Sequence, residues 1–202
     1  MANRRTAVSA TAGELDRLGR ALGAAFEDDP VQQWLFADAP DPAAAIGRFL
    51  RFFVDEYFAL GHTYRLDGDA GADEGGALWA PPGRDVLKGR RIDDLLALVR
   101  SEIGDATEAR LTELARAAAH RPEERHFYLG VLGVVPAVQG RGLGAVLVEE
   151  ILDRCDRAGL VAHLESSNPR NLGFYEPLGF AVVTEFRCGG GPLMTVMTCR
   201  PR

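Results

Sequence analysis

The chain has few cysteines, no excess of basic residues and no long apolar run, and each absence excludes a class of protein. Cysteine occurs 3 times, an odd number, and without a CxxC spacing, so we expect neither a disulfide framework nor a metal site. The formal net charge of −6 predicts no nucleic-acid partner. No stretch approaches the roughly 20 apolar residues of a membrane span, so no membrane partner is expected.

The first residues, Met1–Val8, include two arginines but no apolar segment after them, so we predict no signal peptide and a cytoplasmic protein. The composition is ordinary for a folded protein, with 47% hydrophobic and 26% charged residues over a length of 202. Such a chain can bury a substantial core without disulfides or metals. We expect residues 1–202 to form a single domain.

The first half of the chain alternates helical and strand patterns. Thr11 and Glu14 form a capping box that predicts a helix to about Phe26, and Asp41 followed by Pro42 is a second helix start. The other expected elements are a short strand over 6–10, strands over 62–67 and 77–80 joined by a polar turn over 68–76, and helical segments around 92–103 and 111–118.

The second half begins with a nearly continuous apolar run, His126–Val135, which predicts a central strand buried on both faces. A helix over 143–158, a strand over 160–165 and a short helix from Asn168 to Gly179 follow. Two antiparallel strands, 180–187 and 193–199, complete the pattern. The alternation predicts an α/β protein with a mixed sheet and helices on both faces.

A glycine-rich turn, Gln139–Gly144, joins the predicted central strand to the helix after it. Its three glycines remove the Cβ atoms that would keep a ligand away, and Arg141 and the helix dipole favour an anion. A phosphate or pyrophosphate is the expected ligand; alternatively, the glycines serve only a tight turn. A Walker A loop is excluded because no Lys-Ser or Lys-Thr pair follows, and a Rossmann unit because too few residues follow Glu165.

The segments Leu132–Gly144 and Asn168–Phe180 together resemble the GNAT superfamily of acetyl-CoA-dependent N-acetyltransferases. The first is similar to the family's pyrophosphate motif and the second to its Asn…Tyr helix, which ends in Leu-Gly-Phe. Leu164–Tyr175 is closest in pattern to the puromycin-type antibiotic acetyltransferases. The resemblance covers a core of about 126–180 and implies a GNAT-like fold with a mixed, mostly antiparallel central sheet.

The same resemblance implies acetyl-CoA as co-substrate and no metal. Its binding residues would be Leu132, Gly133, Val134, Gln139, Gly140, Arg141, Gly142, Leu143, Gly144, Ala145, Asn168 and Asn171. In the family the central strand diverges from its neighbour, and the N–H of Val134 would stabilise the oxyanion. Gly130 and Gly133 fit a strand that bulges or admits a ligand, or one whose glycines only relieve crowding. Asn168 is also a good helix N-cap whatever its function.

Tyr175 would be the general acid toward the departing thiolate, by resemblance. A phenol has a pKa of about 10, near that of a thiol, so the proton transfer is nearly balanced. The alternative is a tyrosine that only packs under the short helix. Glu165 ends a strand where an amine would approach and is the candidate base, or else a member of an ion pair. His126 and water remain alternative bases.

The acceptor is expected to be a small-molecule primary amine. Phe26, Asp29 and Trp34 lie where the first two predicted helices meet, and acidic and aromatic side chains together suit a cationic amine. An ordinary solvated loop with one core tryptophan explains the same residues. Two other functions stay open: acetylation of a protein N-terminus or lysine, and non-catalytic binding of acyl-CoA. The sequence also leaves both a monomer and a homodimer open.

Overall fold

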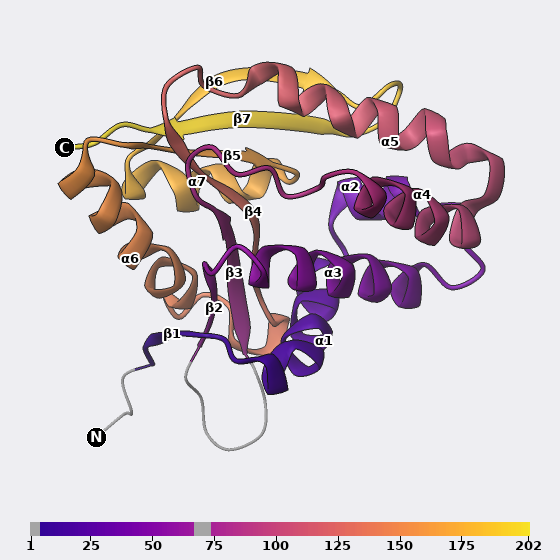
Figure 1. Cartoon of the computed structure of the whole chain (residues 1–202), viewed down its shortest axis with the longest axis horizontal. Coiled ribbons are helices and arrows are strands. Elements are labelled where there is room, and N and C mark those ends of the chain that lie inside the picture. Colours follow the sequence, from indigo (N-terminus) through magenta and orange to yellow (C-terminus); the bar gives the residue numbers. More distant parts are fainter. Residues whose placement is uncertain (1–4, 67–73) are drawn as a thin grey trace.

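The computed structural model describes residues 5–66 and 74–202, and across these residues it contains one seven-stranded sheet (Figure 1). The strand order is β1-β2-β3-β4-β5-β7-β6. β4 and β5 pair in parallel, and the other neighbouring strands pair antiparallel. The strands are β1 (Ala7–Ser9), β2 (Thr63–Leu66), β3 (Gly75–Ala80), β4 (His126–Val134), β5 (Val161–Ser166), β6 (Phe180–Arg187) and β7 (Leu193–Cys199). The predicted mixed, mostly antiparallel sheet is confirmed.

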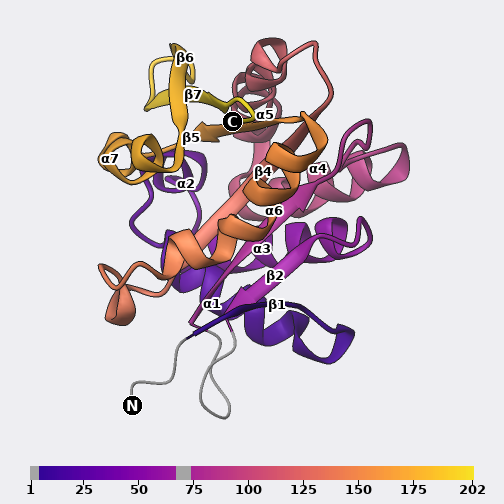
Figure 2. The same ribbon diagram turned by 90° about the vertical axis from the view of Figure 1, so that its left-hand side faces the viewer.

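Helices cover both faces of this sheet, as predicted (Figure 2). Helices α1 to α5 pack on one face, and α6 and α7 pack on the other. The helices are α1 (Leu15–Phe26), α2 (Pro30–Leu35), α3 (Pro42–Phe58), α4 (Arg90–Ile103), α5 (Thr107–Ala115), α6 (Leu143–Ala158) and α7 (Leu172–Tyr175). A short 3₁₀ segment precedes α1, and others flank α7.

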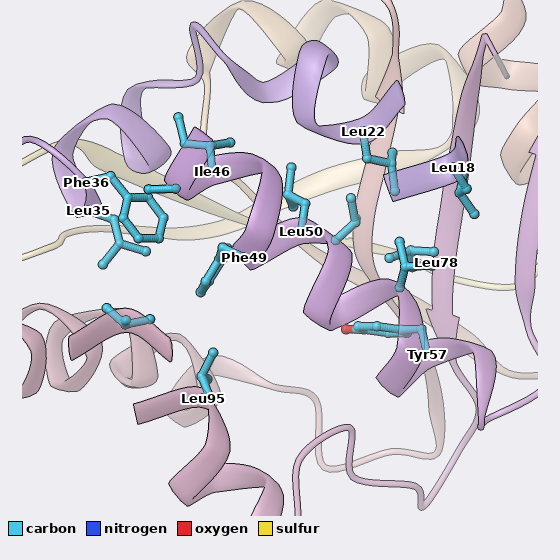
Figure 3. Close-up of a cluster of buried hydrophobic side chains, with 14 of the residues drawn as sticks. Leu18, Leu22, Leu35, Phe36, Ile46, Phe49, Leu50, Tyr57, Leu78 and Leu95 are labelled. Atoms are coloured by element: carbon cyan, nitrogen blue, oxygen red, sulfur yellow. The ribbon is translucent and has the colours of Figure 1, made fainter. Parts of the chain in front are cut away.

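The core on the first face is built by the apolar stripes of α1 and α3 against β3 (Figure 3). Leu18 and Leu22 of α1 are fully buried, as the helical spacing of leucines predicts. The two helices approach closely because both carry glycine at the contact: a Cβ atom on Gly23 would lie 3.2 Å from the Cα of Gly47. This packing fixes the α1–α2 corner above the middle of the sheet.

The core on the second face lies under α6. Its fully or nearly fully buried side chains are Leu147, Val148, Ile151, Cys155, Trp79, Phe127, Leu129 and Leu164. The apolar spacing that predicts α6 therefore marks the face that packs on β3, β4 and β5. This contact sets the direction in which the N-terminus of α6 points.

Two predicted boundaries are wrong. The sequence pattern predicts no helix between Glu27 and Asp41, yet α2 begins at Pro30, directly after its N-cap Asp29. Most of the predicted turn 68–76 lies outside the described residues, but Gly75 and Gly76 already belong to β3. These two positions leave no room for a side chain, since a Cβ atom on Gly76 would lie 2.5 Å from a methyl carbon of Leu18.

The predicted burial of the central strand on both faces is also wrong. Along β4, fully buried residues alternate with partly exposed ones. The partly exposed positions include Tyr128, Gly130 and Leu132, which line a cavity described below. The partly exposed positions of the strand thus border a cavity, in addition to packing on helices.

The capping box at the start of α1 makes stability depend on pH. Glu14 accepts hydrogen bonds from Thr11 and lies beside Arg65, and these contacts lower the pKa of its carboxyl to about 2. A lowered pKa stabilises the fold above the unfolded value of about 4.5, and that contribution is lost as the pH falls toward 2. We expect Glu14→Gln to unfold at lower urea than the parent at pH 7, with the difference shrinking below pH 4.5.

The measurement is urea unfolding followed by circular dichroism across this pH range. Glu149→Gln, at an exposed position on α6, serves as the control and should change stability little. A deficit of Glu14→Gln that stays constant down to acid pH would contradict the role of the ionised carboxylate.

Candidate active site

Strands β4 and β5 separate halfway along their length, and the site lies in the gap. Their parallel pairing ends at Leu129 and Leu164. Beyond that point β4 continues to Val134 against β3, while β5 continues to Ser166 against β7. In the described part of the chain, the backbone groups of β4 that face the gap have no strand partner there. They can hydrogen-bond to an extended ligand that carries amides.

A β-bulge at Gly130 lies where the gap begins. The register with β3 skips this residue, which falls between the paired Leu129 and Val131. A Cβ atom on Gly130 would overlap the hydroxyl of Tyr57 from α3. Bulges bend a strand and redirect its side chains. Both open readings of Gly130 therefore apply: the strand bulges there, and glycine relieves crowding because Tyr57 occupies the space.

The glycine-rich turn connects the end of β4 to α6. Gly140 and Gly142 both have φ of 75°, a conformation that favours glycine. Among the described residues, no atom lies within 4 Å of where their Cβ atoms would be. Gln139 holds the turn to β4, because its Nε2 donates to the carbonyl oxygen of Val134 at 2.9 Å. The first turn of α6 thus presents N–H groups and the positive end of the helix dipole to open space, which fits a diphosphate.

The other predicted residues of this turn divide between solvent and core. Arg141 is exposed. Leu143, the first residue of α6, is buried, and Ala145 is half-buried in the first turn of the same helix. Gly144 faces Phe174 of the α7 segment, since a Cβ atom there would lie 2.9 Å from Phe174 Cζ. This close approach brings the N-terminus of α6 beside α7.

A cavity of about 190 Å³ lies in the gap between the diverging strands. Its lining residues are Phe26, Val31, Gln32, Leu114, Ala117, Tyr128, Leu129, Gly130, Leu132, Leu164, Glu165, Ser166, Ser167, Asn171, Tyr175 and Met194. The cavity thus collects residues from helices of the first half and from β4, β5, α7 and β7. A more open hollow of about 400 Å³ between α1 and α3 contains none of the predicted site residues.

The structure brings Glu165 and Tyr175 to the same cavity. The Glu165 side chain is only 3% exposed, and its Oε1 lies 3.1 Å from Nε2 of His163. Two tyrosines, the buried Tyr57 and the partly exposed Tyr128, lie near the carboxylate. Burial and the negative charge of Glu165 together raise the pKa of both phenols above the ordinary value. Glu165 therefore lies beside two phenols that keep their protons, and the guanidinium of Arg121 lies over the Tyr128 ring at 4.8 Å.

His126, the alternative base, lies outside the cavity. It begins β4, at the end where the strands are still paired, and its Nδ1 is 2.8 Å from the carbonyl oxygen of Glu124. The His126 and His163 rings meet edge to face at 5.6 Å, so the His163 ring stands between His126 and Glu165. Glu165 is the candidate base that reaches the cavity directly.

Tyr175 is 7% exposed, and its ring packs against Phe174 and Phe180. Burial raises the pKa of its phenol, and the charge of Asp29 raises it further. Proton transfer from this phenol to a thiolate is therefore less balanced than the sequence predicts, because the buried phenol holds its proton more tightly than a free one. Its O–H is available as a hydrogen-bond donor throughout the neutral pH range.

The three predicted substrate residues occupy different places. Phe26 lines the cavity, whereas Asp29 is buried behind it and Trp34 packs against Gly191. Asp29 caps α2, accepting hydrogen bonds from the backbone N–H groups of residues 31 and 32, and it also accepts one from the hydroxyl of Ser167. Burial is the main cause that raises the pKa of the Asp29 carboxyl. Asp29 thus ties the α1–α2 corner to the loop after β5.

The remaining predicted residues are also placed. Leu132 and Asn171 line the cavity, while Gly133 lies against Phe26 on the α1 side of β4. The side chain of Asn168 caps the turn before α7 by accepting from the N–H of Arg170 at 3.0 Å. Whether these residues bind a ligand stays a prediction.

Two features of the cavity are not predicted from the sequence. One is helix α2 with Gln32, and the other is the contact between His163 and Glu165. Asp29-Pro30 is the same N-cap and first-turn signature that correctly predicts α3 at Asp41. His163 and Glu165 are two residues apart on one strand, so their side chains share a face. Both signals are present in the sequence.

Across residues 5–66 and 74–202, no three side chains of His, Cys, Asp or Glu come together to hold a metal ion. In the same ranges, the helices are all too short or too polar to cross a bilayer.

The sequence of residues 85–180 matches the model of the acetyltransferase (GNAT) family. An uncharacterized N-acetyltransferase of Schizosaccharomyces pombe is 29% identical over 174 residues, which cover 77% of this chain and 66% of the relative. The chain thus spans slightly less than two thirds of that relative's length.

Solved structures of similar fold match nearly the whole chain. Histone acetyltransferase HPA2 and related acetyltransferase from Corynebacterium glutamicum is 21% identical with a TM-score of 0.69, covering 99% of this chain and 98% of that one. Arylalkylamine N-acetyltransferase 2 from Aedes aegypti is 14% identical with a TM-score of 0.71, covering 99% and 100%. The fold is therefore the GNAT fold, and the homologues are acetyltransferases.

Proposed function

Starting from a chain that has the GNAT fold and matches the family's model over residues 85–180, we propose that the protein is an N-acetyltransferase. The acetyl donor is acetyl-CoA, the co-substrate of the GNAT family, and the acceptor is a small primary amine. The observation that carries the proposal is the meeting of three parts at one gap in the sheet. These are the open glycine-rich turn, the unpaired edge of β4, and a cavity lined by Glu165 and Tyr175.

The donor side is served by residues near the end of β4. The turn Gln139–Ala145 would hold the diphosphate at the N-terminus of α6, and the free edge of Leu132–Val134 would bind the amide-bearing arm. Asn171 lines the cavity and would contact the same arm; Asn168 positions it by capping the turn before α7. When bound, acetyl-CoA supplies an acetyl group activated as a thioester.

The acceptor side is served by Glu165. A primary amine is mostly ammonium at neutral pH, so it must lose a proton before its nitrogen can attack a carbonyl. The Glu165 carboxylate lines the cavity and can take that proton. The nitrogen then bonds to the acetyl carbon, and the carbon–sulfur bond breaks. The nitrogen loses its second proton as the carbon–sulfur bond breaks, and that proton ends on the departing sulfur, to which the Tyr175 O–H donates a hydrogen bond.

The raised pKa of Tyr175 defines how it helps the sulfur leave. A phenol that holds its proton tightly is a poor acid toward a fully formed thiolate, but it donates a strong hydrogen bond as negative charge grows on sulfur. The N–H of Val134 would stabilise the oxyanion on the other side of the reacting carbon, as the resemblance implies. Both donors are fixed by the fold, because Tyr175 is packed between aromatic rings and Val134 ends β4.

The cavity favours a compact acceptor over a protein chain. Its volume of about 190 Å³ lies below the usual small-molecule range of about 300–1,000 Å³, and residues of α2, α5 and β7 wall it. The arylalkylamine enzyme of similar fold also supports an amine acceptor. The puromycin-type pattern of Leu164–Tyr175 adds aminonucleosides to the amines that we propose for testing.

The test is release of the CoA thiol from acetyl-CoA in the presence of alkylamines, aminonucleosides or short peptides. We expect release with at least one class of small amine. Release with peptides alone would overturn the small-molecule acceptor. The absence of acetyl-CoA binding in calorimetry would overturn the function as a whole.

The donor site gives a second, independent prediction. Gly142 precedes α6 with φ of 75° and open space around it, and Asp is among the few residues that tolerate this conformation. Gly142→Asp places a carboxylate at the diphosphate site, so we expect acetyl-CoA affinity to fall by about tenfold or more.

Gly142→Asn is the matched control, because it has the same shape without the charge and should weaken binding less. Calorimetric titration gives the dissociation constants, and circular dichroism shows whether each variant folds. Equal affinities for the parent and Gly142→Asp would contradict the diphosphate site.

A further inference from the structure

The cavity contains a polar atom that the fold does not use. Gln32 of α2 is 9% exposed and lines the cavity, and its Oε1 has no hydrogen-bond partner among the described residues. Burying an acceptor without a donor costs free energy, and such groups are rare in folded proteins. An unpaired buried amide oxygen on a residue that lines a cavity therefore suggests a partner that arrives with the ligand.

The position of α2 is secured without this amide. The backbone N–H of Gln32 donates to Asp29, and the neighbouring Gln33 side chain donates to the carbonyl oxygen of Glu27. Val31 packs against Met194 and Cys188 in a separate apolar cluster. Helix formation and packing are thus satisfied by other groups, which leaves the Gln32 side chain for another role.

We propose that Gln32 determines acceptor specificity: its Oε1 accepts a hydrogen bond from a second O–H or N–H group of the amine substrate. This inference rests on the proposed function, in which Glu165 already serves the reacting nitrogen. Apolar side chains such as Phe26, Leu132 and Met194 also line the cavity and can contact the carbon chain of a compact substrate. The preferred substrate class is therefore a compact amino alcohol or diamine with an apolar body.

Three amines of equal carbon number test this preference: butylamine, aminobutanol and putrescine. They differ in the group at the far end, which is a methyl, a hydroxyl or an amine. A site built to hydrogen-bond a substrate group discriminates strongly against an analogue that lacks it. We expect kcat/KM of the parent for aminobutanol or putrescine to exceed that for butylamine by about tenfold or more.

The variant Gln32→Met keeps the side-chain length and removes the acceptor. We expect it to abolish the preference, with KM rising for the two polar amines and kcat/KM for butylamine unchanged. The unfolding temperature of the free variant should equal or exceed that of the parent, because an unpaired buried acceptor is replaced by an apolar group. Gln33→Met, at the exposed neighbouring position, is the control and should keep the parental preference.

The outcomes separate the two proposals. Acetylation of butylamine as fast as the polar amines, or an equal loss for all three amines in Gln32→Met, would overturn the role of Gln32 while leaving the acetyltransferase function intact. A lower unfolding temperature in Gln32→Met would overturn it in favour of a structural role. If the parent acetylates none of the three amines but does acetylate another small amine, the inference fails and the acetyltransferase function stands; if it acetylates no small amine, both fail.

Discussion

Changing Tyr175 to Phe is expected to lower kcat by about 10²–10⁴-fold, while the dissociation constant of acetyl-CoA changes by less than a few-fold. The ring is buried between Phe174 and Phe180, so Phe keeps the packing, and only the hydroxyl is lost. The effect corresponds to roughly 3–5 kcal/mol of transition-state stabilisation. It falls on kcat because charge grows on sulfur only as the carbon–sulfur bond breaks.

Single-turnover kinetics with a good amine substrate measure this effect. Tyr64→Phe is the control, because Tyr64 is another buried tyrosine on the same face of the sheet but lies on β2, outside the cavity. If Tyr175→Phe turns over at the parental rate with chemistry rate-limiting, the residue only packs, and the thiolate leaves without its help.

Glu165→Gln is expected to lower kcat/KM by about 10²–10⁴-fold near neutral pH. The loss should shrink as the pH rises above the pKa of the amine substrate, because the amine then arrives without its extra proton. Gln retains a polar group toward His163, 3.1 Å from the native carboxylate, so the fold should survive. The pH profile of kcat/KM, compared with the parent, is the measurement.

Glu185→Gln provides the control for the same chemical change. Glu185 lies on β6, outside the cavity, and accepts a hydrogen bond from Thr195. It should leave the pH profile unchanged. A loss in Glu165→Gln that is equal at every pH would indicate that Glu165 binds substrate or supports the fold and does not act as the base.

The features of this protein that are local in sequence could be predicted from it. The capping box at Thr11 and the helix start at Asp41-Pro42 are confirmed. They could be predicted because a capping side chain accepts hydrogen bonds from backbone N–H groups within three residues. The order of the elements from β4 through α6 to β7 could also be predicted, because the spacing of apolar residues indicates each element and glycines mark the turns between them. The central position of β4 also follows, because an apolar strand needs neighbours on both edges.

The features that depend on distant contacts could not be predicted. Gly75 and Gly76 are predicted as part of a turn because glycine is common in turns. Only the structure shows that Leu18 and β4 approach these two residues too closely for a larger side chain. Helix α2 is an intermediate case: its Asp29-Pro30 start is visible in the sequence, but its six residues are too few for a helical period to emerge. The free Oε1 of Gln32 is a property of the surroundings, and no pattern of neighbours in the chain encodes it.

The bond between Asp29 and Ser167 joins two parts of the chain that are otherwise far apart in sequence. The helical wall of the cavity comes from the first 117 residues, whereas Glu165, Tyr175 and the strand residues that line it come from residues beyond 127. Under the proposed function, we therefore expect substitutions on α2 to change the preferred amine without altering Glu165 or Tyr175. Asp29 is the exception, because a substitution there would disturb both the cap of α2 and the bond to Ser167. We therefore expect changes of substrate range to arise more readily at residues 31 and 32 than at Asp29.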